Sequence, residues 1–307
     1  MTTADEFIEP ADQSADDQPN DESYLRDVLK GLVRTTSGKV GIFLLATHLL
    51  MAAFGPWIVP YDPIYVPDST EAEKLEAPSL EHWLGTDRLR RDVLSRTMMG
   101  GRISLAITIS AIFIAIAWSS LAGMFLGLVG GRVDEVVMRI VDAIQAIPYL
   151  LFLLLIISIL GTELWVFIFT LGFFSGISPL RIFRNATLDF VARDFIVAAR
   201  ARGESLWTIL RKELFPNILD IVLVEGAMRW SWMLLSFSSL SFLGFGVAPP
   251  TPDWGLMIAD SRSVMSIAPW WTFSPLIALS TLIIAINLTA DALAKATGLD
   301  RAQGAPV

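Results

Sequence analysis

Long uncharged runs alternate with short charged segments along the chain. Five runs are long enough to be predicted as membrane-crossing helices: residues 40–59, 103–131, 143–162, 164–180 and 263–290. About 20 apolar residues cross roughly 30 Å of hydrocarbon as an α-helix. A sixth apolar segment, 218–243, carries Asp220, Glu225 and Arg229. The pattern predicts an all-α polytopic membrane protein with six transmembrane helices.

The segments between these runs have distinct characters. Residues 60–101 are polar and contain four prolines, which is typical of an external loop. Residues 132–142 have the spacing of a short amphipathic helix on the cytoplasmic side. Glu163 interrupts two apolar runs and predicts a tight external turn. Gly123 and Gly127 form a small-residue motif that permits close helix packing in lipid.

A charged island at residues 191–217, named the coupling loop below, lies between two of the apolar runs. Its apolar residues recur at helical spacing, and Gly203 suits a left-handed helix end. We therefore predict two short helices around a glycine turn, the second ended by Pro216. Such a pair either docks into a groove on a soluble partner or lies on the surface as an ordinary basic loop.

Basic residues predict the orientation. With both termini cytoplasmic, the cytoplasmic segments hold 15 Lys and Arg residues and the external segments hold seven, while Arg229 lies within the membrane. Basic residues in short loops favour the cytoplasmic side. The residues before the first helix are interpreted as part of a signal anchor, because basic residues precede a full-length apolar span.

Composition agrees with a membrane protein, since 53% of the 307 residues are hydrophobic and the mean hydropathy is +0.57. The formal charge of −8 comes from Met1 to Glu22, which hold eight acidic residues and no basic one. This stretch is expected to be disordered. We divide the chain into a tail (1–36), a first helix with its external loop (37–101), a core (102–295) and a C-terminal tail (296–307).

Catalytic chemistry has little support in the sequence. No phosphate-binding loop is found, cysteine is absent, and His48 and His82 are the only histidines. His48 is interpreted as a neutral side chain packed inside the first helix. No catalytic or metal site is predicted, and an intramembrane protease is disfavoured. A stand-alone ion-coupled secondary transporter stays open as an alternative, although no internal repeat supports it.

Four stretches together resemble one family. They are the coupling loop with Ala198-Ala199, Gly203 and Phe215-Pro216-Asn217; HWLGTDRLRRDVLSRTMMGGR at 82–102; RVDEVVMRIVD at 132–142 with Ile147-Pro148; and SLSFLGFGVAPPTPDWG at 239–255. The chain resembles the C-type permease subunit (DppC/OppC-like) of binding-protein-dependent ABC importers of the dipeptide, oligopeptide and nickel group. Arg90, Val197, Glu213 and Phe215 stand where that family usually has Gly, Glu, Ile and Leu.

This resemblance implies a type I ABC importer permease fold in a bacterial inner membrane, with the coupling loop seated on an ATP-binding subunit. The implied coupling residues are Ala198, Ala199, Arg200, Gly203, Glu204, Leu206 and Pro216. It also implies a second, B-type permease, two ATP-binding subunits that hold ATP and Mg²⁺, and an extracytoplasmic solute-binding protein. No cofactor is expected on this chain. The implied solute is a di- or oligopeptide, a nickel chelate, glutathione or an opine-like compound.

A candidate solute path lies on the sixth segment, where Glu225, Arg229, Trp230 and Trp232 occur in an otherwise apolar stretch. A charge that faced lipid there would cost about 2.5–3.5 kcal/mol, so these residues are expected to face protein or water. Glu225 and Arg229 are four residues apart and lie on one helical face. They form either a closed salt bridge or, through Arg229, a contact with a solute carboxylate.

Overall fold

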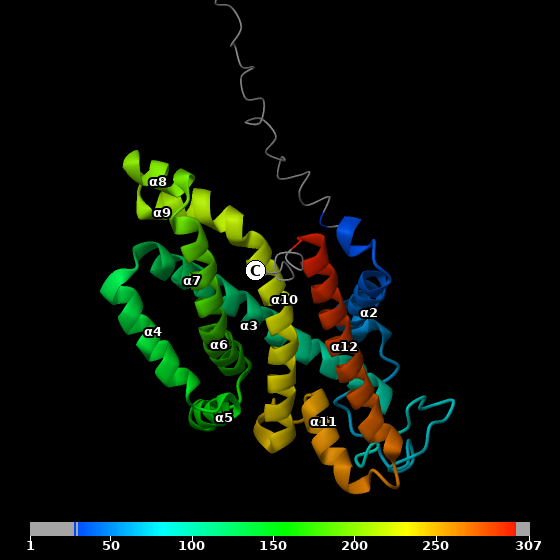
Figure 1. Cartoon of the computed structure of the whole chain (residues 1–307). Coiled ribbons are helices and arrows are strands. Elements are labelled where there is room, and N and C mark those ends of the chain that lie inside the picture. Colours follow the sequence, from blue (N-terminus) through cyan, green and yellow to red (C-terminus); the bar gives the residue numbers. More distant parts are fainter. Residues whose placement is uncertain (1–27, 29, 299–307) are drawn as a thin grey trace, which may run out of the picture.

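The computed structural model describes residue 28 and residues 30–298, and its regular elements are helices (Figure 1). The acidic stretch from Met1 to Glu22, which is predicted to be disordered, lies outside the described residues, as does most of the C-terminal tail. The helices are α2 (Thr36–Ile58), α3 (Val93–Val129), α4 (Gly131–Gln145), α5 (Tyr149–Leu160), α6 (Leu164–Ser175), α7 (Ile177–Val191), α8 (Asp194–Ala201), α9 (Leu206–Thr208), η2 (Ile209–Leu214), α10 (Phe215–Leu240), η3 (Ser241–Phe245), α11 (Trp254–Ser261), η4 (Arg262–Val264) and α12 (Pro269–Ala296).

Four stretches are long and apolar enough to cross a membrane: α2, α3, the α6–α7 stretch and α12. The bent pair α4 and α5 would make a fifth if it counts as one span. Helix α10 is less apolar, because it carries Asp220, Glu225 and Arg229. The prediction of an all-helical membrane protein is confirmed at this level.

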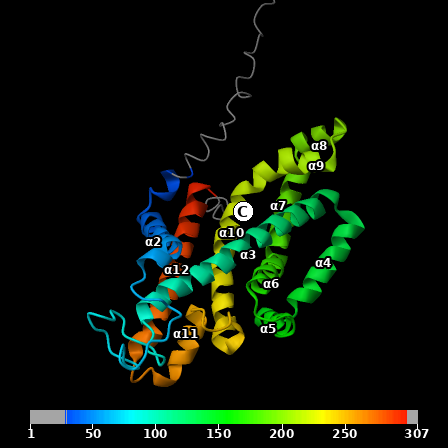
Figure 2. The same ribbon diagram turned by 180° about the vertical axis from the view of Figure 1, so that it is seen from behind.

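Helices α3 and α10 organise the bundle. Helix α3 crosses it obliquely and packs against α6 and α7 on one side and against α2 and α10 on the other (Figure 2). Helix α10 also packs against α12, which lies along α2. Glycine permits the closest approach: a Cβ on Gly123 would lie 2.6 Å from the Leu180 oxygen, and one on Gly127 would lie 2.8 Å from Thr187 Cβ. The close packing predicted for the two glycines is confirmed.

The helix predicted over 143–162 is interrupted in the structure, where α4 ends at Gln145 and α5 begins at Tyr149. The chain bends by 86° between α4 and α5, with the break before Pro148. Proline lacks an N–H group, its ring clashes with the carbonyl four residues earlier, and it disfavours helical geometry at the preceding residue. The tight turn at Glu163 is confirmed, because α5 ends at Leu160, Gly161 has φ of +92° and α6 begins at Leu164.

Two other predicted boundaries differ from the structure. Helix α3 begins at Val93, ten residues before the uncharged run, because Asp92 caps it by accepting a hydrogen bond from Ser95 N. Pro216 does not end a helix; it lies in the first turn of α10, directly after the π-helical turn η2. Helical geometry is continuous from α9 through η2 into α10, so Pro216 interrupts the hydrogen-bond ladder of one helix, and the π-helical turn η2 lies where that interruption falls.

The segment between α2 and α3 is fixed to α3 by side chains, since Arg96 Nη1 donates to the Pro63 carbonyl at 2.6 Å and Ser95 Oγ accepts a hydrogen bond from Tyr61 N at 3.2 Å. Arg90 takes a left-handed φ of +67°, at the position where the resembling family has glycine. Asp87 Oδ2 accepts a hydrogen bond from Arg91 Nε at 2.7 Å, and both side chains are buried.

His48 is packed as predicted, with Nε2 3.0 Å from Thr281 Oγ1 and its ring edge-on to Trp254.

Candidate functional site

The coupling loop forms a compact projection at one end of the molecule. Helices α8 and α9 lie at the same end as the start of α2 and the end of α12 (Figure 1). Side chains from its helices enter a buried cluster with α3 and α7, consisting of Met124, Leu128, Phe183, Ala186, Ile196, Ala199, Ile209, Leu210, Leu214, Ile218 and Val222. The projection is therefore packed against the bundle through a continuous buried apolar contact.

A glycine turn separates the two short helices, as predicted. Gly203 has φ of +75°, its N–H donates to the Arg200 carbonyl at 3.0 Å, and Glu204 N donates to the Ala199 carbonyl at 3.2 Å. These two bonds form the Schellman arrangement that ends a helix. Arg202 and Glu204 also form an exposed ion pair across the turn.

The other predicted coupling residues differ in their burial and in their contacts. Ala199 is fully buried, whereas Ala198 is exposed. Arg200 Nη2 donates to the carbonyl of Leu128 at 2.8 Å, which ties α8 to the end of α3, where the helix dipole favours a cation. Pro216 is exposed at the base of the projection.

Three large apolar side chains protrude from α8 and α9. Val197, Leu206 and Trp207 are 54%, 47% and 59% exposed, among charged neighbours. Sequence reasoning named Leu206 but not Val197 or Trp207. Trp207 lies on the three-residue helix α9, directly before the π-helical turn η2, whereas Leu210 and Leu214 of that turn are buried. We name these three residues the coupling surface.

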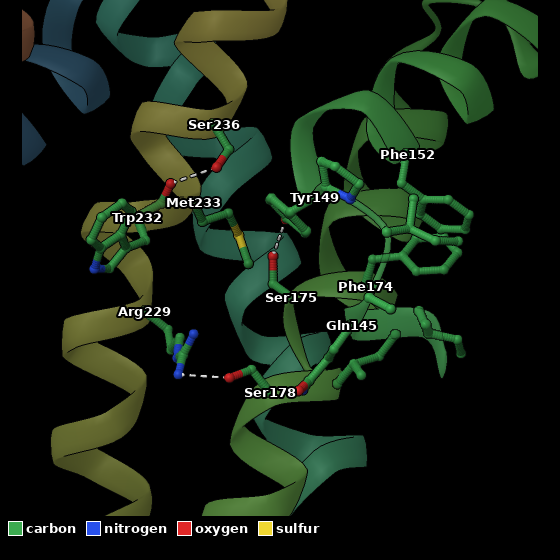
Figure 3. Close-up of a pocket in the computed structure, with 15 residues that line it drawn as sticks. Gln145, Tyr149, Phe152, Phe174, Ser175, Ser178, Arg229, Trp232, Met233 and Ser236 are labelled. Carbon is green, nitrogen blue, oxygen red and sulfur yellow. Dashed lines mark hydrogen bonds between the residues drawn. The ribbon is translucent and has the colours of Figure 1, made fainter. Parts of the chain in front are cut away.

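A second feature is a cavity of about 620 Å³ between α10 and the α4–α7 region (Figure 3). Its lining residues are Ile144, Gln145, Ala146, Ile147, Pro148, Tyr149, Phe152, Phe174, Ser175, Ile177, Ser178, Arg229, Trp232, Met233 and Ser236. The bend before Pro148 shapes one wall, and Tyr149 hydroxyl lies 2.6 Å from Ser175 Oγ. We name this the central cavity. Sequence reasoning missed Tyr149, Ser175 and Ser178, because helices distant in sequence bring them together.

Arg229 reaches the central cavity while paired to its own helix. Its Nε donates to Glu225 Oε1 at 2.5 Å, and its Nη2 donates to Ser178 Oγ on α7 at 3.0 Å. The predicted pairing of Glu225 and Arg229 is therefore present. Glu225 does not line the cavity.

The two tryptophans predicted with Arg229 lie on different faces of α10. Trp232 lines the central cavity and is 67% exposed, whereas Trp230 faces α3 and donates from Nε1 to Thr108 Oγ1 at 3.0 Å. An α-helix turns by about 100° per residue, so Trp230 lies on another face than Arg229, while Trp232 returns to nearly the same face.

Comparison with known proteins shows matches to two family models, and both describe membrane components of transport systems. Residues 119–298 match the family described as "Binding-protein-dependent transport system inner membrane component", which is more than half of the chain. Residues 23–78 match the N-terminal transmembrane domain of oligopeptide transport permease C.

Curated relatives cover most of the chain. It is 32% identical to the dipeptide transport system permease protein DppC of Bacillus subtilis (strain 168) over 275 residues, which are 89% of this chain and 85% of that protein. It is 37% identical to the glutathione transport system permease protein GsiD of Shigella flexneri serotype 5b (strain 8401), with 81% of each chain covered. The GsiD protein of Pectobacterium atrosepticum is 34% identical, with 89% of each chain covered.

Family and fold agree on the class of protein. The apolar helices and the match to an inner-membrane component describe a multi-pass protein of a bacterial inner membrane. In this family ATPase activity lies in partner subunits, and the secondary-transporter alternative is set aside. The chain belongs to the family of binding-protein-dependent transport system inner membrane components and is a permease subunit of an ABC importer.

Proposed function

We propose that this chain forms one half of a heterodimeric pore and is driven through its coupling surface by an ATP-binding subunit. The observation that carries the proposal is the coupling surface itself: three exposed apolar side chains on a projection whose other face is buried in the bundle. Exposed aromatic and apolar residues on a rigid support are typical of binding hot spots. Ala198, which is exposed, and the Gly203 turn complete the contact region.

Six transmembrane spans with both termini cytoplasmic are part of the proposal. Helix α10, with 26 residues, is about 39 Å long and therefore long enough to cross the hydrocarbon. The pairing of Glu225 with Arg229 reduces the cost of placing both charges there. The start of α2 and the end of α12 share one end of the molecule with α8, and Arg193, Arg200 and Arg202 support a cytoplasmic location for that end.

The partners follow from the family. We propose a second, B-type permease, two ATP-binding subunits that hold ATP and Mg²⁺, and an extracytoplasmic solute-binding protein. When the ATP-binding subunits close, the coupling loop moves with them. Because buried side chains join that loop to α3 and α7, its displacement reorients these helices as rigid bodies and alternates the access of the pore.

The proposed solute is a peptide or a similar small compound, within the range of di- and oligopeptides, nickel chelates, glutathione and opine-like compounds. The names of the relatives support a small peptide-like solute, because they refer to dipeptide and glutathione transport. We place the solute path along the central cavity, past Arg229 and Trp232. Glu225 contributes by holding Arg229, and Trp230 contributes packing rather than contact.

Co-purification tests the proposal. The full chain is expressed with its second permease and ATP-binding subunits, and the retained ATP-binding subunit is measured for Trp207→Ala and Leu206→Ala. Loss of a hot-spot side chain costs about 2 kcal/mol or more, so affinity should fall at least about thirtyfold.

Phe43→Ala is the matched control, because Phe43 is an exposed aromatic residue on α2 away from the coupling loop. It should leave the complex intact. If both coupling-surface variants retain the ATP-binding subunit as the parent does, the docking assignment is wrong.

A further inference from the structure

We propose that the central cavity holds a transit site for a solute carboxylate, with Arg229 as its binding group. The inference rests on the proposed function and deepens it by naming the chemical class of the solute: a small compound with a carboxylate and an apolar part. The starting observation is that a guanidinium group and a large apolar wall share one cavity of about 620 Å³.

The lining carries one cation and no carboxylate. Arg229 is its only Lys or Arg residue, Asp and Glu are absent from it, and Glu225 is excluded from the wall. A negatively charged group inside the cavity can therefore contact the guanidinium of Arg229, and no carboxylate of the lining repels it. In a site with little water, this gives a preference for anions over cations.

Arg229 keeps binding capacity after its internal contacts are made. Its guanidinium has five N–H groups, and the bonds to Glu225 and Ser178 use two of them. The other three have no hydrogen-bond partner among the described residues, on a side chain that is 29% exposed. Two parallel N–H groups match the two oxygens of a carboxylate.

Glu225 acts as a positioning residue. Its bond to Nε holds the guanidinium in place, and Ser178 holds the far side, so the group is oriented before a ligand arrives. The same carboxylate offsets part of the positive charge and weakens anion binding. Weak binding suits a passage, because a solute must leave the site as readily as it enters.

The remaining walls fit an apolar solute portion. Phe152, Phe174 and Trp232 present aromatic surface, and Met233 adds a flexible thioether (Figure 3). The hydroxyl groups of Tyr149 and Ser175 lie across the cavity from α10 and offer hydrogen bonds to amide groups. The volume lies within the range of small-molecule sites, about 300–1,000 Å³.

Charged thiol reagents test the site without knowledge of the natural solute. Ser236 lines the cavity and bonds to the carbonyl of Trp232 in its own helix, so Ser236→Cys changes few contacts. The assembled complex in proteoliposomes is treated with a negatively charged and a positively charged thiosulfonate reagent of similar size. The parent chain has no cysteine and reports the background from partner subunits.

We expect the thiol introduced by Ser236→Cys to react faster with the negative reagent than with the positive one. Adding Arg229→Gln should reduce the ratio of the two rates about fivefold or more. Gln145→Ala is the charge-neutral control, because Gln145 lines the cavity and makes no contact assigned to Arg229, and it should leave the ratio close to that of Ser236→Cys alone. Ser69→Cys, on the external loop, should show no effect of Arg229→Gln.

An unchanged ratio in Arg229→Gln would show that Arg229 serves only as the partner of Glu225, and the inference would be overturned. Absence of reaction with both reagents would overturn it as well, because the cavity would then be closed to water-soluble solutes. Failure of the proposed function is distinguished by a separate measurement on the same preparation. If the complex hydrolyses ATP and transports while the ratio is unchanged, only the carboxylate site is wrong.

Discussion

The indole Nε1 of Trp254 donates a hydrogen bond of 2.7 Å to the carbonyl oxygen of Thr97, which joins α11 to the first turns of α3. The ring is almost fully buried. Two glycines make room for it, since a Cβ on Gly100 would lie 3.0 Å from the indole and one on Gly101 would lie 2.6 Å from it. Trp254 therefore connects the segment that follows α10 to the first turns of α3.

Trp254→Ala is expected to destabilise the protein by about 3–5 kcal/mol, because it leaves a large cavity beside two glycines that cannot fill it. Trp254→Phe should cost less, since it mainly loses the bond to Thr97, worth about 1 kcal/mol. The thermal unfolding midpoint of the detergent-purified complex measures both. Trp57→Ala serves as the control, because Trp57 is 80% exposed; equal midpoints for the alanine variants of Trp254 and Trp57 would refute the anchoring role.

Replacing Gly203 with valine should uncouple ATP hydrolysis from transport while membrane insertion stays intact. A Cβ at this position meets no atom within 4 Å, so the penalty comes from the left-handed backbone, at about 1–2 kcal/mol. The turn is expected to relax and shift α9 relative to α8. Uptake and ATPase activity are measured together in proteoliposomes.

Gly203→Asn is the matched control, since asparagine tolerates the left-handed region better than other residues. It should retain most of the coupling. A valine variant with parental uptake and ATPase activity would mean that the turn is not needed for force transmission.

Cysteine accessibility measures the proposed orientation. Ser69 and Ser266 are exposed in the segments placed outside, and Ser205 is exposed on the coupling loop. In sealed cells, an impermeant thiol reagent should label Ser69→Cys and Ser266→Cys, whereas Ser205→Cys should react only after permeabilisation. The cysteine-free parent gives the background. Labelling of Ser205→Cys in sealed cells would reverse the orientation and remove the coupling assignment.

The helical class and the order of the helices could be predicted from apolar runs alone, because uncharged stretches of this length have few soluble alternatives. The turn at Gly203 was predictable too, since its residues form a local motif. The ends of the helices were harder to predict. Asp92 starts α3 within a charged stretch, and Pro216 lies inside continuous helical backbone instead of ending a helix, so neither feature coincides with a change in hydropathy.

The central cavity could not be predicted in full from sequence. Arg229 and Trp232 stood out because polar and aromatic groups are conspicuous in an apolar segment. Ser178 and Tyr149 did not, because a serine or tyrosine in an apolar helix is ordinary until tertiary packing brings it to Arg229 and Ser175. Trp230 was assigned to the path by proximity in sequence, and only its helical phase separates it from Arg229.

The contact between α4 and α7 yields a last prediction. Arg184 pairs with Asp134 through Nε and Nη2 on the two carboxylate oxygens, and Asp134 is buried. Arg184→Ala removes a charge-assisted pair that is only partly buried and should cost about 1.5–3 kcal/mol, with Asp134→Ala restoring part of the loss in the double variant. Thermal midpoints of the single and double variants form the cycle that measures the coupling.

Arg181 and Asp142 provide the internal comparison, because they join the same two helices at side chains that are about half exposed. Exposed ion pairs contribute at most about 1 kcal/mol, so Arg181→Ala should shift the midpoint little. If the losses in Arg184→Ala and Asp134→Ala simply add, the two residues act independently. In that case, the bent arm formed by α4 and α5 is held to α7 by apolar packing around Val141 and Leu180 rather than by charge.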